Sequence, residues 1–202
     1  MIVPKLHLAS TSPRRQEILA ALGLTFSSAG VGLDERRFDG ETAQDMVLRL
    51  AQAKAAAATV DEPTIVIAAD TAVVLGGEVY GKPVDRKDCL AMLQDLSGRT
   101  HQVLTGVAVR SPQGVQTVLS TTEVQFREIS PDEALAYWQS GEPRDKAGAY
   151  AIQGKGGVFV MAISGSYSGV VGLPVFETAE LLRDAGLNIL RVPDQAGDIE
   201  NV

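Results

Sequence analysis

A short basic turn near the start of the chain has the residue types of an anion-binding site. It contains Ser10, Ser12, Arg14 and Arg15, between a short apolar run and an amphipathic segment. Ser12 followed by Pro13 predicts a helix N-cap and first helical position, because proline lacks the amide proton that the first turn leaves unpaired. Hydroxyls, backbone amides and two guanidinium groups then meet at the positive end of a helix. This arrangement favours the binding of a phosphate chain.

Three further charged residues could complete such a site, although each also has an ordinary structural interpretation. Asp70 ends an apolar run, where its carboxylate either caps a turn or faces a ligand crevice as a general base or metal ligand. Lys82 lies in a Gly-Lys-Pro turn and is either a solvated surface residue or a ligand-facing cation. Glu35 belongs to a charged loop, which is usually a solvated surface, but it could be a second metal-facing carboxylate.

Lys54 is a cation on the apolar side of a predicted helix. At 100° per residue it falls inside an arc formed by Met46, Val47, Leu50 and Ala57. Either its aliphatic stem follows the edge of the core towards solvent, or its ammonium group reaches into a polar cleft.

Composition limits the possible functions. The chain has 202 residues and a net charge of −7, which argues against general binding to nucleic acid or to a membrane surface. We found no signal-peptide pattern and no apolar run of membrane-spanning length. A single cysteine, Cys89, makes a reducing cytoplasm the default location. With only His7 and His101 besides, any metal would be a hard cation held by carboxylates, and His101 is interpreted as a structural residue.

The charged candidates form a chemically coherent set. Arg14, Arg15, Lys54 and Lys82 match a polyphosphate, and Glu35 and Asp70 match a divalent cation bridging it. The chain has no Walker-type loop, no kinase signature and no serine-hydrolase pattern. These residues therefore point to a metal-assisted phosphoanhydride hydrolase.

Alternating segments favour an α/β architecture that would position these residues. The predicted strands are 5–9, 25–28, 64–69, a hairpin over 72–80, 102–110, 115–126 and 158–163. The predicted helices are 13–22, 42–58, 86–96, 131–140 and 174–185. Residues 144–157 read as a glycine-rich irregular segment. Residues 1–191 are expected to form one domain, followed by a polar, disordered tail over 192–202.

Several motifs together resemble the Maf family of nucleotide pyrophosphatases. The chain contains LASTSPRRQEIL, AADT with GEVYGKP downstream, SGRTHQVLTGV, and DKAGAYAIQGKGG followed by GSYSGVVGLP. The resemblance implies an elongated, mixed twisted sheet in two lobes with a central cleft, like that of inosine triphosphatases. It also implies a cytoplasmic homodimer that hydrolyses nucleoside triphosphates to monophosphate and pyrophosphate with Mg²⁺ or Mn²⁺.

The same resemblance assigns roles to individual residues. Asp70 of AADT would be the catalytic base and a metal ligand. Phosphate would be bound by Arg15, Lys54 and Lys82, together with Ser10 and Ser12. Glu35 would be the other metal ligand, a role that the neighbouring Asp34 could also fill.

Three positions resemble the branch of the family that acts on dTTP and UTP. These are Arg14, Thr71 and Gln153, where the branch acting on 7-methyl-GTP carries tryptophan, glutamine and glutamate. A neutral amide such as Gln153 suits the donor–acceptor edge of uracil or thymine, whereas a cationic methylated guanine favours an aromatic face and a carboxylate. Lys155 is a departure that places an extra cation nearby. Two alternatives remain: a pyrophosphatase for 7-methyl-GTP or for a broad range of modified nucleotides, and a non-catalytic nucleotide-binding regulator of septum formation.

Overall fold

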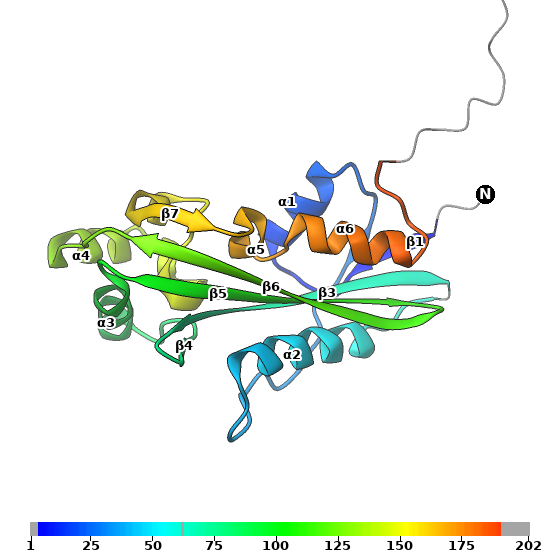
Figure 1. Ribbon diagram of the computed structural model, residues 1–202, viewed down its shortest axis with the longest axis horizontal. Helices are drawn as coiled ribbons and strands as arrows, with labels where there is room; N and C mark the ends of the chain where they lie inside the picture. Colours follow the sequence, from blue (N-terminus) through cyan, green and yellow to red (C-terminus); the bar gives the residue numbers. More distant parts are fainter. Residues whose placement is uncertain (1–3, 62, 191–202) are drawn as a thin grey trace, which may run out of the picture.

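Three long strands run through the molecule and connect its two ends. In the computed structural model, which describes residues 4–61 and 63–190, these strands are β3 (Thr64–Leu75), β5 (Thr100–Ser111) and β6 (Gly114–Phe126). Neighbouring strands in this trio are antiparallel. Figure 1 shows that this trio gives the molecule its elongated shape.

Shorter strands complete a seven-stranded sheet of order β2-β1-β3-β5-β6-β7, with β4 also paired to β3. They are β1 (Lys5–Leu8), β2 (Ser27–Ser28), β4 (Glu78–Tyr80) and β7 (Val160–Ser164). The strand pairs β1–β2 and β1–β3 are parallel and the others are antiparallel. The sheet is therefore mixed, as predicted.

Helices cover both faces of the sheet. They are α1 (Pro13–Ala21), α2 (Ala43–Ala57), α3 (Arg86–Leu96), α4 (Pro131–Gln139), α5 (Tyr167–Val171) and α6 (Val175–Asp184). Helix α2 lies on one face of the sheet, whereas α1, α5 and α6 lie on the other (Figure 1). Three short 3₁₀ turns, Glu142–Asp145, Ala147–Ala149 and Lys155–Phe159, form most of the predicted irregular segment. None of the helices in the described part of the chain is long and apolar enough to cross a membrane.

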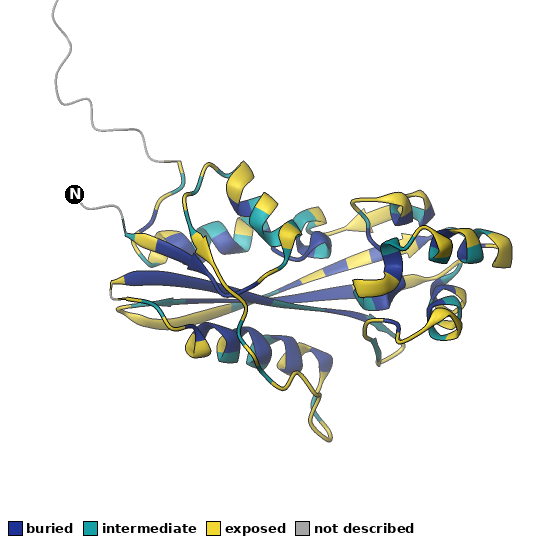
Figure 2. Ribbon diagram, turned by 180° about the vertical axis from the view of Figure 1, so that it is seen from behind, coloured by how far each residue is buried: buried dark blue, intermediate teal, exposed yellow. Residues whose placement is uncertain are grey.

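Hydrophobic side chains form separate clusters towards the two ends. One cluster joins α1 and α6 to β1 and β3, and includes Leu8, Leu19 and Leu182. Another joins α3 and α4 to the far ends of β5 and β6, and includes Leu93 and Phe126. Figure 2 shows long strands buried over most of their length, as β3 and β5 are, whereas exposed residues interrupt β6. This division confirms the predicted two lobes.

His101 belongs to the core of the second lobe, as predicted. Its side chain is buried, its Nε2 lies 2.9 Å from the Tyr150 hydroxyl oxygen, and its ring packs edge-on against Phe126. Burial lowers the pKa of His101 to about 4. His101 is therefore neutral at physiological pH.

Local signals locate several helix ends correctly. The Thr42 hydroxyl accepts a hydrogen bond from the Asp45 amide at the start of α2. Ser130 and Glu133 form a reciprocal capping box at the start of α4. Two expectations were wrong: β3 does not end near Asp70, and Ala57, expected on the apolar side of its helix, is exposed. Helix α5 was missed. The predicted tail over 192–202 lies outside the described residues.

Gly106 allows α2 to approach the sheet closely. A Cβ atom at Gly106 would lie 2.5 Å from the Val47 carbonyl oxygen and 2.9 Å from the Leu48 amide nitrogen. These contacts involve the backbone of α2, so the helix could not relieve them by a side-chain rotation.

We expect Gly106→Ala to lower the free energy of unfolding by about 1–3 kcal/mol, because the helix must move away from the sheet. Urea denaturation measures the change. The matched control is Gly32→Ala, where a Cβ atom would meet nothing within 4 Å. Equal stability of the two variants would contradict close packing at Gly106.

Candidate active site

A notch in the sheet opens the main cleft between the lobes. One edge of β3 pairs with β1 up to Ile67 and with β4 from Val73 onwards. Among the described strands, none pairs with that edge between these two points, where Asp70 and Thr71 lie. Asp70 therefore lies within a continuous strand beyond the carboxyl end of β1, and the predicted strand end at Asp70 is wrong. The cleft opens at this point because β1 ends at Leu8, whereas β3 continues past it to Leu75.

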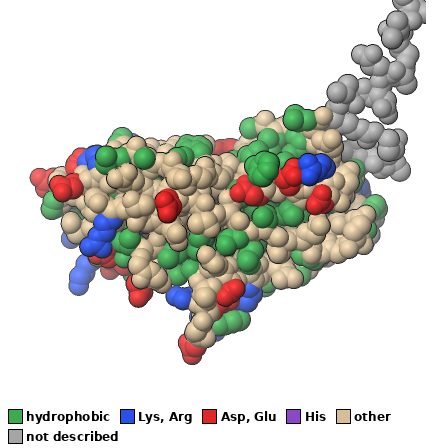
Figure 3. Space-filling view, viewed as in Figure 1, with side chains coloured by type: hydrophobic (Ala, Val, Ile, Leu, Met, Phe, Trp, Pro, Cys, Tyr) green, Lys and Arg blue, Asp and Glu red, His purple; other side chains and the backbone are tan. Residues whose placement is uncertain are grey.

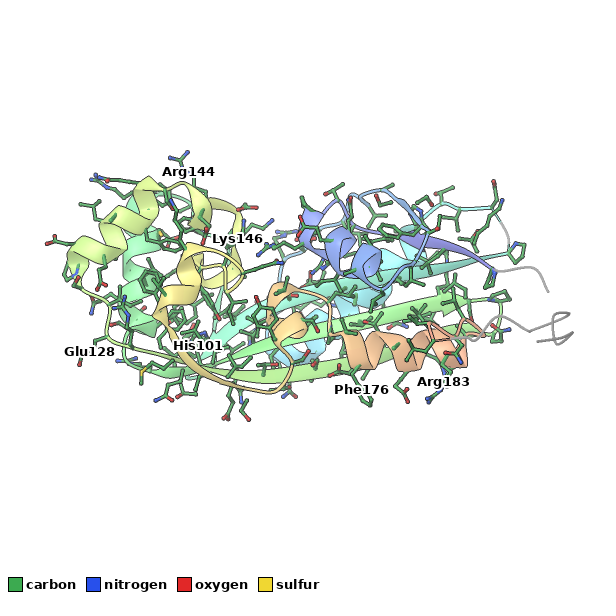
Figure 4. All side chains as sticks on the ribbon, turned by 90° about the horizontal axis from the view of Figure 1, so that it is seen from above. His101, Glu128, Arg144, Lys146, Phe176 and Arg183 are labelled. Atoms are coloured by element: carbon green, nitrogen blue, oxygen red, sulfur yellow. The ribbon has the colours of Figure 1, made fainter. Side chains whose placement is uncertain are left out.

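The cleft has a volume of about 740 Å³ and receives side chains from both lobes. On the first lobe it is lined by Ser10, Ser12, Arg14, Arg15, Glu35 and Lys54, with Asp70 and Thr71 at the notch. On the second lobe it is lined by Tyr80, Lys82, Asp145, Lys146, Tyr150 and Ile152. Figure 4 shows Lys146 at the side of the second lobe that faces α1. The fold therefore brings nine of the ten predicted site residues into one cleft.

Lys54 bridges two carboxylates at the notch. Its ammonium nitrogen lies 2.6 Å from Asp70 Oδ1 and 2.6 Å from Glu35 Oε1. The side chains of Lys54 and Asp70 are only 10% and 13% exposed, whereas Glu35 is 54% exposed. Of the two interpretations of Lys54, the structure supports the ammonium that reaches into the cleft.

The environment shifts the pKa values of the two carboxyl groups in opposite directions. Burial raises the pKa of Asp70, although Lys54 and Arg15 act in the opposite direction. Burial also acts upward on Glu35, but Lys54, Lys82 and Arg15 together outweigh it, so the pKa of Glu35 is lowered. Relative to its ordinary pKa, the environment of Asp70 therefore favours the protonated form and that of Glu35 favours the charged form.

Arg49 fastens the loop that carries Glu35. Its guanidinium donates to both carboxylate oxygens of Glu41 and to the Arg36 carbonyl oxygen, and it stacks over the Phe38 ring. Asp34 accepts hydrogen bonds from Arg36 and is exposed. Glu35, not Asp34, therefore faces Lys54 and Asp70.

Arg15 presents an oriented guanidinium on the opposite side of β3. Its Nε donates to the Gly172 carbonyl oxygen at 2.8 Å, and its two terminal nitrogens donate to Ser10 and Thr71 hydroxyl oxygens at 3.3 Å each. A guanidinium has five N–H donors, so one remains on each terminal nitrogen. Two such donors form the fork that binds a phosphate group in a bidentate manner.

Among the described residues, no side chain caps the first turn of α1. Ser12 is the N-cap residue and Pro13 is at the first helical position, as predicted, but the Ser12 hydroxyl makes no capping hydrogen bond. Instead the Ser12 amide donates to the Ser10 hydroxyl oxygen at 3.2 Å. A helix N-terminus that lines a cleft without a side-chain cap is suited to an anionic ligand.

Gln153 is the one predicted site residue outside the cleft lining. Its side chain is exposed, and its neighbour Ile152 lines the cleft instead. Arg14 lines the cleft and acts electrostatically on Asp145 of the other lobe. Base recognition by Gln153 stays a prediction.

The donor set can hold a divalent cation only with help from a ligand. Within residues 4–61 and 63–190, no three His, Cys, Asp or Glu side chains cluster as a ready metal site. Asp70 and Glu35 supply two carboxylates that already share one cation, the Lys54 ammonium. Mg²⁺ commonly binds through one or two carboxylates together with water and substrate phosphate oxygens. The residues present therefore fit such a cation.

Two contributors to the cleft were missed by reasoning from the sequence. Gly172, which follows α5, supplies the carbonyl oxygen that orients Arg15, and Lys146 adds a cation from the second lobe. Ser166 caps α5 by accepting from the Gly169 amide. This serine-to-glycine spacing was the local signal for α5, but a five-residue helix leaves little periodicity to detect.

Fold and cleft together define an α/β protein whose interlobe cleft suits a polyanion beside a buried carboxylate. The chain belongs to the Maf family, because the model of the Maf-like proteins matches residues 5–185.

Its relatives are similar over nearly the whole chain. A Methylococcus capsulatus protein named dTTP/UTP pyrophosphatase is 50% identical over 190 residues, which cover 93% of this chain and 94% of that protein. A Vibrio vulnificus protein of the same name is 51% identical over 182 residues, 89% of this chain and 98% of that protein. Among solved structures, the Staphylococcus aureus Ham1 protein gives a TM-score of 0.43 at 16% identity, covering 60% of this chain and 71% of that one.

We expect Asp70→Asn to raise the free energy of unfolding at neutral pH. The substitution removes a buried charge, while the amide oxygen can still accept from Lys54. Because the pKa of Asp70 is raised in the folded protein, the folded state holds the carboxyl proton more strongly than the unfolded chain. Ionisation therefore costs stability as the pH rises from the ordinary value of 3.8 through the folded pKa.

Urea unfolding of both proteins over a pH series measures this effect. The difference in free energy of unfolding between the two proteins should be absent below pH 3.8 and complete above the raised pKa of Asp70 in the folded protein. Asp39→Asn, at an exposed aspartate, is the matched control. A variant less stable than the wild type at neutral pH would contradict the prediction, because it would make the Lys54–Asp70 pair net stabilising.

Proposed function

We propose that this protein hydrolyses dTTP and UTP to the nucleoside monophosphate and pyrophosphate, and that residues 1–191 act as one catalytic domain. The names of relatives about half identical to it support the substrates. The observation that carries the chemistry is the buried Asp70 carboxylate, with cations on both sides of its strand.

In this proposal, the cations hold the triphosphate. Arg15 offers two oriented N–H groups, and the first turn of α1 offers backbone amides beside Ser10 and Ser12. Lys54 and Lys82 approach from the α2 side and from the second lobe. Binding between two lobes fixes the phosphate chain relative to Asp70, which is a contribution of position and orientation.

Asp70 then accepts a proton from the attacking water. Water attacks the α-phosphorus, the bond from that phosphorus to the α–β bridging oxygen breaks, and pyrophosphate leaves with the bridging oxygen. Burial suits Asp70 to this role, because a raised pKa makes the carboxylate a better proton acceptor near neutral pH. Arg15 and Lys82 stabilise the charge that develops on the phosphate oxygens.

Asp70 and Glu35 would hold a divalent cation, Mg²⁺ or Mn²⁺. When bound, such a cation neutralises phosphate charge and lowers the pKa of coordinated water. Lys54 shares the same two carboxylates, so it keeps them close together before the substrate and cation arrive.

Arg14, Thr71 and Gln153 are proposed to select the pyrimidine base. Arg14 and Thr71 line the cleft, and the exposed Gln153 follows Ile152, which also lines it. No nucleic-acid partner is proposed, which fits the net charge of −7 and the scattered basic side chains of the face in Figure 3.

We propose a cytoplasmic homodimer as the working form. The single free cysteine, Cys89, suits a reducing compartment. The edge strand β7 is uncharged and exposes Met161 and Ile163, and an uncharged edge allows a second copy to pair across a two-fold axis. Apolar side chains are also exposed at Tyr167 and Phe176, and Phe176 points away from the molecule in Figure 4.

We expect Asp70→Asn to reduce pyrophosphate release from dTTP by about 10²–10⁴-fold, the usual contribution of a general base. Release is measured from a panel of triphosphates with Mg²⁺ or Mn²⁺, and dTTP binding is measured by calorimetry. Asp39→Asn should retain wild-type activity. Binding of dTTP without hydrolysis of any triphosphate by the wild type would instead indicate a nucleotide-binding regulator. A preference for 7-methyl-GTP would overturn only the proposed base specificity.

We expect Lys82→Met to raise the KM for dTTP about tenfold or more, because a charged hydrogen bond to phosphate is lost. The matched control is Lys87→Met, which removes an exposed lysine of α3 outside the cleft lining. Steady-state kinetics compare the two variants. An equal KM in both would exclude Lys82 from substrate binding.

A further inference from the structure

Two threonines connect the cleft to α5. Thr71 of β3 and Thr105 of β5 are directly opposite in the antiparallel register, and their hydroxyl oxygens lie 3.0 Å apart. The Thr105 hydroxyl donates to the Gly169 carbonyl oxygen at 2.8 Å. Thr105 is only 1% exposed, so no solvent competes for its hydroxyl.

The number of protons fixes the direction of every hydrogen bond in this chain. A hydroxyl group carries one proton, and the Thr105 proton is used by the Gly169 carbonyl oxygen, which can only accept. Thr71 must therefore donate its own proton to Thr105. Arg15 can only donate, so Thr71 accepts from Arg15. The hydrogen bonds run in one direction, from Arg15 through Thr71 and Thr105 to α5.

This direction decides what Thr71 can offer to a ligand. Thr71 lines the cleft, but its proton points away from it towards Thr105. Arg15 uses one lone pair of the Thr71 oxygen, so the second lone pair is what the hydroxyl has left for a ligand. Without Thr105, the Thr71 hydroxyl could rotate and either donate or accept, as an unconstrained hydroxyl does.

We propose that Thr105 is a positioning residue that makes Thr71 an obligate hydrogen-bond acceptor, and that this selects uracil and thymine against cytosine. The inference rests on the proposed function, in which Thr71 contacts the base. The only hydrogen-bond donor on the ring of uracil or thymine is N3–H, whereas N3 of cytosine can only accept. An acceptor at Thr71 forms a hydrogen bond with N3–H of uracil or thymine, whereas it meets a second acceptor at N3 of cytosine. A site built around one hydrogen bond rejects a base that cannot form it.

The test is the ratio of kcat/KM for UTP to that for CTP in Thr105→Val. Valine keeps the shape of threonine and removes the hydroxyl, so the Thr71 proton becomes free to turn towards cytosine N3. We expect the ratio to fall about tenfold, the effect of one hydrogen bond. Thr105→Ser should keep the wild-type ratio, because serine keeps the hydroxyl.

A matched control separates base selection from support of α5. Thr122 of β6 is also 1% exposed. Its hydroxyl oxygen accepts from the Ser166 amide, and its O–H donates to the Ser166 carbonyl oxygen at the start of α5. Thr122→Val therefore loosens the same helix without touching Thr71. The UTP-to-CTP ratio should stay at the wild-type value in this variant, even if its thermal midpoint falls.

Three outcomes would overturn the inference. These are an unchanged UTP-to-CTP ratio in Thr105→Val, an equal fall of this ratio in Thr122→Val, and an equal fall in Thr105→Ser. Calorimetric binding of dTTP and dCTP, with Asp70→Asn in the background, tests the same preference without catalysis. If the wild type releases no pyrophosphate from pyrimidine triphosphates, the proposed function fails. The ratio of the affinities for dTTP and dCTP, compared with and without Thr105→Val, still shows whether Thr105 makes the site prefer thymine to cytosine.

Discussion

The buried charge of Asp70 is the constraint on which the rest of this structure depends. A carboxylate removed from water needs a cation close by, and Lys54 provides it at 2.6 Å. This pairing requires α2 to lie directly against the sheet, which Gly106 permits by having no side chain. It also leaves Lys54 able to hold the outer carboxylate of Glu35, on a loop that Arg49 fastens. The charge pair thereby links a strand, a helix and a loop.

The notch in the sheet makes both faces of β3 useful at the same point. Adjacent residues of a strand point to opposite faces, so Asp70 and Thr71 meet different partners. Asp70 meets the lysine of α2, and Thr71 meets Arg15 and the hydroxyl of Thr105. Had β1 continued beyond Leu8, it would have covered this edge. The site depends on where a neighbouring strand ends as much as on the residues of β3 itself.

Much of the fold was predictable because its signals are local. Proline at the first turn of α1, the Thr42 cap and the capping box at Ser130 each depend on neighbouring residues. The expected strand end at Asp70 was wrong because a carboxylate after an apolar run normally signals solvent. Here it signals a buried ion pair whose partner lies 16 positions away. Helix α5 was missed because tertiary contacts to Thr105 and Thr122, not periodicity, hold its five residues.

The sequence by itself determined the class of chemistry: the cations, the two carboxylates and the motifs that resemble one family. Side-chain type and local spacing are sufficient for that. Only the tertiary structure decided that Glu35 and not Asp34 faces Asp70, that Lys54 points inward, and that the Thr71 proton points away from the cleft. These outcomes depend on distances between segments far apart in the chain and on which single proton each hydroxyl can give. Neither quantity is written in the order of the residues.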